Sequence, residues 1–205
     1  MLNDQILTLA KRIKSIADIG LLYTKNEYDA ERYAELKTIG FELTAKITDE
    51  PIEAIENFYF TETDYPTAKV DIRGLIVKGD QVLLAREADG KWSLPGGWGD
   101  IGYSPKETII KEFKEETGLD ILVERLLAAY DKKMHPHPPQ PFYVYKMVFY
   151  CISETKLFQK GFDMLDVQYF NIHQLPEISE DRILKSQLES LFNKVKTGDV
   201  TTDFD

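Results

Sequence analysis

One segment, residues 96 to 119, limits most strongly how this chain can fold. It reads "GGWGDIGYSPKETIIKEFKEETGL", a glycine-rich loop followed by a helical pattern. Ser104 and Glu107 have the spacing of a capping box, and Pro105 suits the first turn of a helix. Gly118 supplies a helix stop. The segment therefore predicts a loop that leads into a helix beginning at Pro105 and ending just before Gly118.

Three carboxylates lie close together on this predicted helix. At about 100° per residue, Glu112, Glu115 and Glu116 share an arc of roughly 100°. Like charges three or four residues apart destabilise a helix unless something offsets them. Lys111 and Lys114 offer one offset, as parts of an ordinary solvated face. The glycines upstream and the stop glycine downstream favour another, a divalent cation such as Mg²⁺ or Mn²⁺, which prefers oxygen ligands.

The first third of the chain has a helical pattern throughout. Apolar residues recur at helical spacing from Ile6 to Ala17 and again from Tyr33 to Ile47, and Pro51 suits the start of a third helix. The sequence predicts a small all-helical domain over residues 1 to 64 and a second domain over residues 65 to 205.

The second domain has a strand pattern. "AKVDIRGLIVKGDQVLLARE" contains two β-rich runs around Gly79-Asp80, which is a two-residue hairpin signal. "ILVERLLAAY", "FYVYKMVFYCIS" and "VQYFNI" predict further strands, and the end of "HQLPEISEDRILKSQLESLFNKV" predicts a helix. We expect the polar tail "TGDVTTDFD" to be frayed.

Charge and composition bear on the possible partners. The chain carries 25 basic and 35 acidic side chains, a formal net charge of -10, which disfavours nucleic acid without excluding RNA. Its single cysteine, Cys151, lies in an apolar run and is expected to be a buried hydrophobe. Lys11, Arg12 and Lys14 interrupt the first apolar segment, and no apolar stretch is long enough to span a membrane. We expect a cytoplasmic protein with no membrane partner.

The carboxylate segment resembles the signature of the Nudix hydrolases, G-x5-E-x7-R-E-U-x-E-E-x-G-U, where U is a bulky apolar residue. Seven of its nine specified positions are in register, from Gly97 to Leu119. Tyr103 stands where the first glutamate belongs and Lys111 where arginine belongs, which in the family form a structural brace. We interpret both as a subfamily variation, because the metal-facing carboxylates are retained. The resemblance implies an α+β fold, an α/β/α sandwich with a mixed sheet.

The resemblance also implies the reaction and the residues that perform it. Nudix hydrolases cleave the diphosphate of a nucleoside diphosphate linked to another moiety X, with Mg²⁺ or Mn²⁺ as cofactor. By position, Glu112, Glu116 and the Gly96 carbonyl correspond to metal ligands. Glu115 is a further ligand or, with Glu112, part of the catalytic machinery. Other members take the general base from a later loop, for which the candidates are Asp163 and Asp166.

Substrate contacts are predicted outside the helix. Arg86 and Arg73 are candidate phosphate clamps, because an arginine fork matches phosphate oxygens; both also suit surface ion pairs. The proline-rich loop "DKKMHPHPPQPFYVYK" suggests a stiff substrate or dimer loop, with Lys133 and His137 as candidate contacts.

The loop and the helical domain together resemble a Nudix branch typified by bacterial CDP-choline pyrophosphatase. That branch implies a nucleotide substrate, CMP and phosphocholine as products, and a homodimer. The alternatives are ADP-ribose or other nucleotide sugars, RNA ends, and a nucleotide sensor without catalysis.

Overall fold

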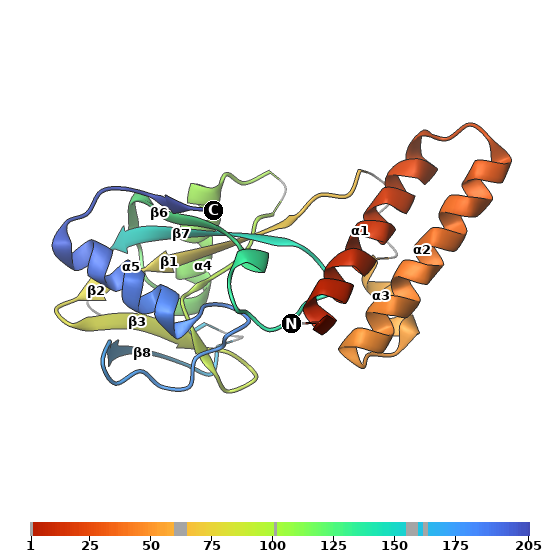
Figure 1. The fold of residues 1–205 in the computed structure, drawn as a ribbon. Helices are drawn as coiled ribbons and strands as arrows, with labels where there is room; N and C mark the ends of the chain where they lie inside the picture. Colours follow the sequence, from red (N-terminus) through yellow and green to blue (C-terminus); the bar gives the residue numbers. More distant parts are fainter. Residues whose placement is uncertain (1, 60–64, 101, 155–159, 162–163) are drawn as a thin grey trace. The chain divides into compact units, whose positions relative to one another are not determined.

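The computed structural model describes residues 2–59, 65–100, 102–154, 160–161 and 164–205. Its contacts separate two compact units. We call Met1–Ala68 with Pro139–Tyr143 the helical unit, and Lys69–Pro138 with Val144–Asp205 the sheet unit. Figure 1 labels the α-helices of both units and the strands for which there is room. The division at residues 64 and 65 stays a prediction about domains.

Three helices form the helical unit, as the sequence predicted: α1 (Leu2–Tyr23), α2 (Glu27–Thr48) and α3 (Ile52–Tyr59). Asn26 caps α2 by accepting a hydrogen bond from the Tyr28 backbone N–H at 2.9 Å. The buried Asp18 carboxylate of α1 lies 2.8 Å from the ammonium groups of Lys14 and Lys37. Since Lys37 belongs to α2, this buried charge cluster joins the two long helices.

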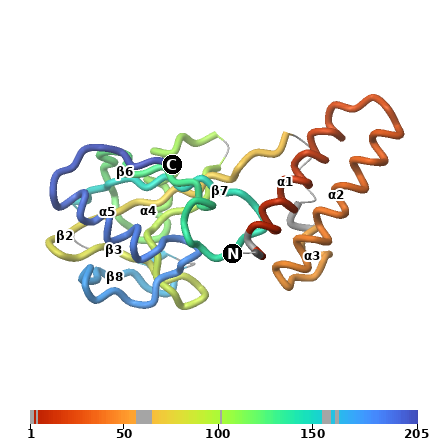
Figure 2. The backbone as a smooth tube through the Cα atoms, in the orientation of Figure 1, coloured from red at the N-terminus to blue at the C-terminus, as the bar shows by residue number. Residues whose placement is uncertain are grey.

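A five-residue segment, which we call the strap, completes this unit from far along the chain. Lys11 donates hydrogen bonds to the carbonyls of Gln140 at 2.8 Å and Phe142 at 3.2 Å. The Tyr143 hydroxyl donates to the Thr8 carbonyl at 3.2 Å. Figure 2 traces the chain through the strap, Pro139–Tyr143, into β7. The proline-rich loop expected as one piece is therefore divided between the units, after Pro138.

The sheet unit contains two sheets. The five-stranded sheet has the order β5-β1-β7-β6-β9, in which β1 is parallel to β7 and antiparallel to β5. In the other sheet, β3 pairs with β2, β4 and β8. The strands are β1 (Lys69–Leu75), β2 (Val77–Lys78), β3 (Gln81–Arg86), β4 (Trp92–Ser93), β5 (Gly96–Trp98), β6 (Leu122–Asp131), β7 (Val144–Ile152), β8 (Asp166–Asn171) and β9 (Asp203–Phe204). The helices are α4 (Pro105–Thr117), α5 (Lys185–Thr197) and the 3-10 turn η1 (Lys132–Met134).

Both sheets contribute to two hydrophobic cores. In β3, Val82 and Leu84 belong to the core that contains Leu188 of α5. The intervening residue Leu83 belongs to the core that contains Phe113 of α4. Successive side chains of a strand point to opposite faces, so β3 is buried on both. The predicted sandwich with a mixed sheet is confirmed.

Two local expectations had different outcomes. The hairpin signal is confirmed, because Gly79 with φ 59° and Asp80 connect β2 to β3. The prediction of a frayed tail is wrong. β9 pairs with β6, and the Asp205 carboxylate accepts a hydrogen bond from the Asp131 N–H at 2.9 Å. Lys194, at the end of α5, lies 2.8 Å from Asp203. These contacts between distant residues order a tail that looks polar and unstructured by itself.

Cys151 is buried in the core, as expected, and burial raises the pKa of its thiol to about 12. Among the helices of the described residues, none has the length and apolar character needed to cross a bilayer.

A substitution at Gly74 of β1 tests how closely α4 packs on this strand. A Cβ at this position would collide with the Phe113 ring and lie 3.1 Å from Cγ1 of Ile109. Overpacking of a buried site costs about 1–3 kcal/mol, so we expect Gly74→Ala to lower the free energy of unfolding in urea by that amount. Gly99→Ala, whose Cβ would meet no atom nearer than 3.4 Å, is the control. Equal losses in the two variants would contradict the close packing.

Candidate active site

Helix α4 is fixed at both ends by the signals seen in the sequence. The Ser104 N–H donates to Glu107 Oε2 at 2.8 Å, and the Glu107 N–H donates to Ser104 Oγ at 3.3 Å, completing the capping box. At the other end Gly118 has φ 71°, and its N–H donates to the Lys114 carbonyl at 3.1 Å. The start and the end of α4 thus agree with the prediction.

The glycine-rich loop lies directly on this helix. Gly96 pairs with Arg73 of β1 and has φ 141°, and any Cβ there would collide with the Ile72 carbonyl. A Cβ on Gly97 would lie 2.6 Å from Oε1 of Glu112. Glycine is therefore required at Gly96, where the backbone approaches β1, whereas a side chain at Gly97 would displace the carboxylate of Glu112.

Two of the three glutamates meet in a cleft of about 410 Å³. Glu116 is 7% exposed, and its Oε2 accepts a hydrogen bond from the Gly96 N–H at 2.9 Å. Burial raises the pKa of Glu116 to about 8, against the lowering effect of Arg73. Burial also raises the pKa of Glu112, which is less deeply placed. The cleft is lined by Arg73, Glu87, Ala88, Gly96, Gly97, Trp98, Asp100, Glu112, Glu116, Met164 and Arg182.

The third glutamate points elsewhere. Glu115 is exposed, and its Oε2 lies 3.7 Å from Lys111 Nζ. It is not among the residues that line the cleft. The sequence predicted that all three carboxylates lie on one face of α4. In the structure, Glu112 and Glu116 line the cleft and Glu115 does not.

The two departures from the Nudix signature contact each other. Lys111 Nζ lies 5.6 Å from the centroid of the Tyr103 ring, within cation–π range. The same ammonium lies 3.4 Å from Oδ2 of Asp100, a contact that raises the pKa of Lys111. Asp100 therefore places a carboxylate beside Lys111 where Tyr103 lacks one, and the loop still contacts α4.

Charges of alternating sign lead from the interior of the sheet unit into the cleft. Asp71 pairs with Lys146 and accepts a hydrogen bond from Arg73 Nε at 2.8 Å. Arg73 Nη1 lies 3.7 Å from Glu87, and Arg182 Nε lies 3.3 Å from Oε2 of Glu87. Lys146 is 0% exposed and Arg73 3% exposed. Of the predicted clamps, Arg73 therefore reaches the cleft from a fully paired, buried position.

The other predicted contacts lie outside the cleft lining. Arg86 is exposed and donates to the Gly90 carbonyl at 2.8 Å. Lys133 Nζ lies 3.5 Å from Asp131. Asp166 opens β8, where its oxygens accept from the Val167 N–H at 2.8 Å and the Gln168 amide at 2.5 Å. Asp163 lies outside the described residues.

Several cleft residues were not predicted. Glu87 directly follows Arg86, but β3 is buried on both faces, so an alternation of polar and apolar residues could not indicate which of the two enters the cleft. Arg182 comes from a loop far along the chain and has no local signal. Trp98 and Met164 also line the cleft.

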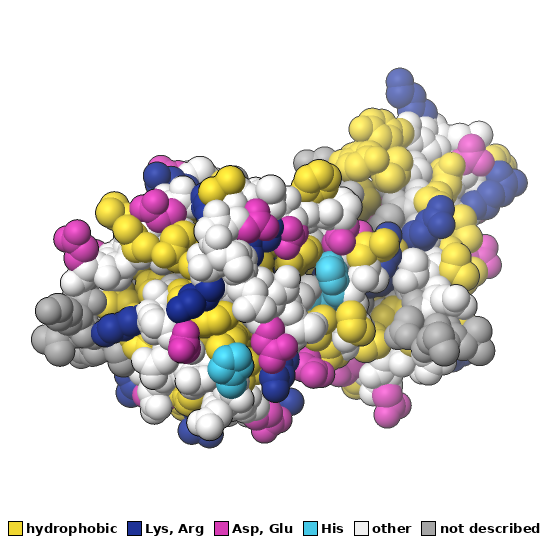
Figure 3. Space-filling model, turned by 60° about the vertical axis from the view of Figure 1, so that its left-hand side comes forward, with side chains coloured by type: hydrophobic (Ala, Val, Ile, Leu, Met, Phe, Trp, Pro, Cys, Tyr) yellow, Lys and Arg dark blue, Asp and Glu magenta, His cyan; other side chains and the backbone are white. Residues whose placement is uncertain are grey.

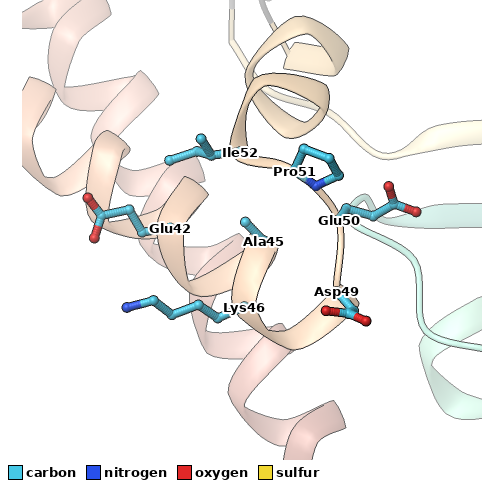
Figure 4. Close-up of a pocket in the computed structure, with 7 residues that line it drawn as sticks. All are labelled: Glu42, Ala45, Lys46, Asp49, Glu50, Pro51 and Ile52. Atoms are coloured by element: carbon cyan, nitrogen blue, oxygen red, sulfur yellow. The ribbon is translucent and has the colours of Figure 1, made fainter.

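A second hollow, of about 420 Å³, lies on the helical unit between α2 and α3 (Figure 4). Its charged lining residues, Glu42, Lys46, Asp49 and Glu50, are all exposed. Charged side chains that are exposed to water interact only weakly. The hollow therefore lacks the buried carboxylate that the cleft has in Glu116.

Comparison with known proteins places this geometry in a family. Residues 67–191 match the NUDIX domain model. The chain belongs to the Nudix hydrolase family. Residues 4–59 match a second model, described as "UDP-X-like, N-terminal oligomerisation domain". The helical region is therefore a recognised companion of this Nudix domain.

Individual relatives span almost the whole chain. YjhB of Bacillus subtilis (strain 168) is named provisionally as an ADP-ribose pyrophosphatase. It is 41% identical to this chain, over 97% of this chain and 96% of the length of YjhB. A solved UDP-X diphosphatase is 36% identical, with a TM-score of 0.63 over 99% of both chains. An ADP-ribose pyrophosphatase from Streptococcus suis 89-1591 is 34% identical, with a TM-score of 0.62 over 68% of this chain and 100% of its own.

Nudix hydrolases generally use divalent metal ions, and the cleft has suitable donors. Within the described residues no group of three or more His, Cys, Asp or Glu side chains is arranged to hold a metal. Mg²⁺ however needs only one or two protein carboxylates, since substrate phosphates and water complete its shell. Glu112 and Glu116 meet that requirement.

The ionisation of Glu116 can be tested in the metal-free protein. A carboxyl with a pKa near 4.5 when unfolded and about 8 when folded binds its proton more tightly in the folded state. The free energy of unfolding should therefore fall as pH rises from about 5 to 8, by up to about 1.4 kcal/mol per pH unit. Glu116→Gln cannot ionise and should lose less stability over that range. Urea unfolding at pH 5, 6.5 and 8 in EDTA checks this, and parallel profiles would contradict it.

Proposed function

We propose that this Nudix hydrolase cleaves nucleoside diphosphates linked to a sugar, such as ADP-ribose or a UDP-sugar, between the two phosphates. The observation that carries the proposal is one cleft in which Glu112 and Glu116 lie beside Arg73 and Arg182. Such a cleft provides carboxylates for a cation and guanidinium groups for phosphate oxygens. The relatives named for UDP-X and ADP-ribose support the choice of substrate.

Four cleft residues have assigned roles in this proposal: Glu112, Glu116, Gly96 and Arg73. Glu112, Glu116 and the Gly96 carbonyl would hold Mg²⁺ or Mn²⁺, which when bound neutralises phosphate charge and activates water. Arg73 is oriented by Asp71 and by the Leu94 carbonyl, to which Nη1 donates at 3.0 Å. Its fixed guanidinium orients the diphosphate at little entropic cost.

The residue that accepts the proton of the attacking water stays a prediction. Glu115 is exposed beside Lys111 and is the candidate on α4 outside the metal-holding pair. Asp166 is occupied by hydrogen bonds within its own strand. Activity of Glu115→Gln across pH therefore separates a base on α4 from one in the loop that contains Asp163.

CDP-choline, the substrate first expected, is the second candidate. It rests on the proline-rich loop and the helical domain, which resemble the CDP-choline pyrophosphatase branch. A panel of ADP-ribose, UDP-glucose, CDP-choline and a capped RNA, ranked by kcat/KM with Mg²⁺ and with Mn²⁺, separates the candidates. Preference for CDP-choline or RNA would overturn the sugar assignment, and binding without turnover would indicate a sensor.

Glu112→Gln and Glu116→Gln test the metal-holding pair. Each removes one anionic ligand, and we expect kcat/KM to fall at least about 100-fold, because even outer-shell partners of a metal cost about 10- to 100-fold. Excess EDTA should abolish the activity and added Mg²⁺ or Mn²⁺ should restore it. Glu53→Gln, an exposed change on α3, is the control. Turnover close to wild type in either cleft variant would remove that residue from the site.

We also propose that the helical unit joins two copies of the chain. Leu9, Ile16 and Tyr23 recur every seven residues along α1, and all three are exposed. Residues at this spacing form one stripe on a helix, the arrangement that pairs helices in coiled coils. Figure 3 shows hydrophobic side chains at the surface of this part of the molecule. The family description of residues 4–59 as an oligomerisation domain supports a homodimer.

Ile16→Glu tests this stripe by placing a charge at its centre. A buried unpaired carboxylate in the interface is unfavourable, so we expect the mass in solution to fall from dimer to monomer, as measured by light scattering. Val200→Glu makes the same kind of change at an exposed apolar residue of the sheet unit and should leave the mass unchanged. A wild-type monomer, or an Ile16→Glu dimer, would contradict the proposal.

A further inference from the structure

Trp98 brings a large aromatic ring to the cleft. It is the last residue of β5 and is 38% exposed, although tryptophan is usually well buried. The other tryptophan of the chain, Trp92, is 8% exposed and packs against Phe170 in a hydrophobic core. Of the described residues that line the cleft, Trp98 alone is aromatic. Its indole therefore offers aromatic surface to a molecule bound in the cleft.

The strand pairing fixes where this ring lies relative to Arg73. Trp98 is directly opposite Asp71 in the antiparallel pairing of β5 with β1, so both side chains lie on one face of the sheet. Arg73 is two residues from Asp71 and shares that face. The Gly99 N–H donates to the Val70 carbonyl at 2.7 Å, which holds the backbone directly after Trp98. The indole and the guanidinium group therefore face the same side of the sheet.

The distance along β5 fits the dimensions of a nucleotide. Gly96, whose N–H binds Glu116, lies two residues before Trp98, which is roughly 6–7 Å along a strand. Arg73 is directly opposite Gly96. In a nucleotide, the ribose separates the base from the first phosphate by a comparable gap. A diphosphate held at Glu116 and Arg73 would thus bring its base to the indole.

A lysine restricts the orientation of the ring. Lys69 Nζ lies 5.9 Å from the centroid of the Trp98 ring, within cation–π range. Lys69 opens β1 two residues before Asp71, so it lies on the same face of the sheet. A ring that is already held in place loses less conformational entropy when a ligand stacks on it.

We propose that Trp98 is the stacking platform for the nucleobase of the substrate. The base is the aromatic part of a nucleoside diphosphate sugar, and Trp98 is the residue of the described cleft lining that matches it. Stacking does not depend on the hydrogen-bonding groups of the base, so the platform should accept purines and pyrimidines alike. The inference rests on the proposed function and adds how the nucleoside half of the substrate is recognised.

AMP and ribose 5-phosphate, which differ only in the base, test the platform by calorimetric titration with Mg²⁺. Trp98→Leu keeps an apolar side chain but removes the ring, so we expect it to bind AMP at least about 5-fold more weakly than wild type. Its affinity for ribose 5-phosphate should not change. UMP should show the same kind of loss as AMP. Trp98→Phe restores a ring and should bind AMP almost as tightly as wild type.

Phe204→Leu is the matched control. It makes the same kind of change at a 79% exposed aromatic residue of β9, outside the cleft lining, and should leave every affinity unchanged.

Fluorescence provides a readout that a structural role alone would not change. A stacked base alters the environment of the indole, so AMP should quench the tryptophan emission of wild type and ribose 5-phosphate should not. Trp98→Phe should bind AMP without this quench, because its remaining tryptophan, Trp92, is buried in the core. A quench that persists in Trp98→Phe would overturn the proposal.

Three results of the titrations would also overturn it. Unchanged AMP affinity in Trp98→Leu would mean that the base lies elsewhere. Equal losses for AMP and ribose 5-phosphate would mean that the ring contacts the sugar or supports the fold. A loss for AMP or UMP alone would contradict a platform that accepts both kinds of base.

The titrations do not depend on the proposed reaction, because neither ligand contains a diphosphate. If wild type binds AMP as expected but hydrolyses no nucleoside diphosphate sugar, the proposed function fails and the platform stands. If wild type is active, Trp98→Leu should raise KM for ADP-ribose at least about 5-fold with kcat unchanged, because the ring binds the base and not the reacting atoms. A fall in kcat with KM unchanged would overturn the platform.

Discussion

The interior of the sheet unit depends on the carboxylate of Asp71. It stands between Lys146 and Arg73, and all three side chains are at least 97% buried. Burial alone would raise the pKa of Asp71, but the two neighbouring cations outweigh it and hold this pKa below its usual range. Lys146 and Asp71 are directly opposite in the parallel pairing of β1 with β7. The strand register therefore decides that the charges meet, and a slip by one residue would separate them.

A buried ionic group is weak evidence for stability, because desolvation can exceed the attraction between the charges. In this protein the buried charges of Asp71 and its neighbours orient the side chain of Arg73. With Asp71 on one side and Glu87 on the other, Arg73 cannot swing away from the carboxylates of α4. The same electrostatic field reaches Glu116, whose pKa Arg73 lowers against the effect of burial. One buried carboxylate on β1 thereby influences both the cationic and the anionic sides of the cleft.

Local chemistry made much of the fold predictable. The capping box and Gly118 define α4, the Gly79-Asp80 pair defines a hairpin, and helical spacing identifies the long helices of the first domain. The cleft was predictable only in part. Glu112 and Glu116 belong to one contiguous motif and were predicted from it. Glu87 and Arg182 are 95 positions apart in the chain, and only the fold brings them into contact.

The proline-rich loop also shows that contacts between distant parts of the chain could not be predicted from the sequence. The sequence favoured Lys133, but the turn η1 buries Lys132 and leaves its neighbour exposed. Adjacent lysines look equivalent in a sequence, because only the direction of the local backbone distinguishes them. The ordered tail was missed for a related reason, since its partners Asp131 and Lys194 lie in other elements.

The strap has a consequence for the order in which the protein is completed during synthesis. Lys11 and Thr8 bind residues that leave the ribosome more than 120 positions later. Its phenylalanine also packs against the core formed by Phe41 and Ile55. The helices can form early, but their last apolar contacts and the partners of Lys11 arrive only after about half of the sheet unit, Lys69–Pro138, has been translated. The N-terminal third is thus the first part to be synthesised, yet it cannot be completed until the first half of the sheet unit has followed it.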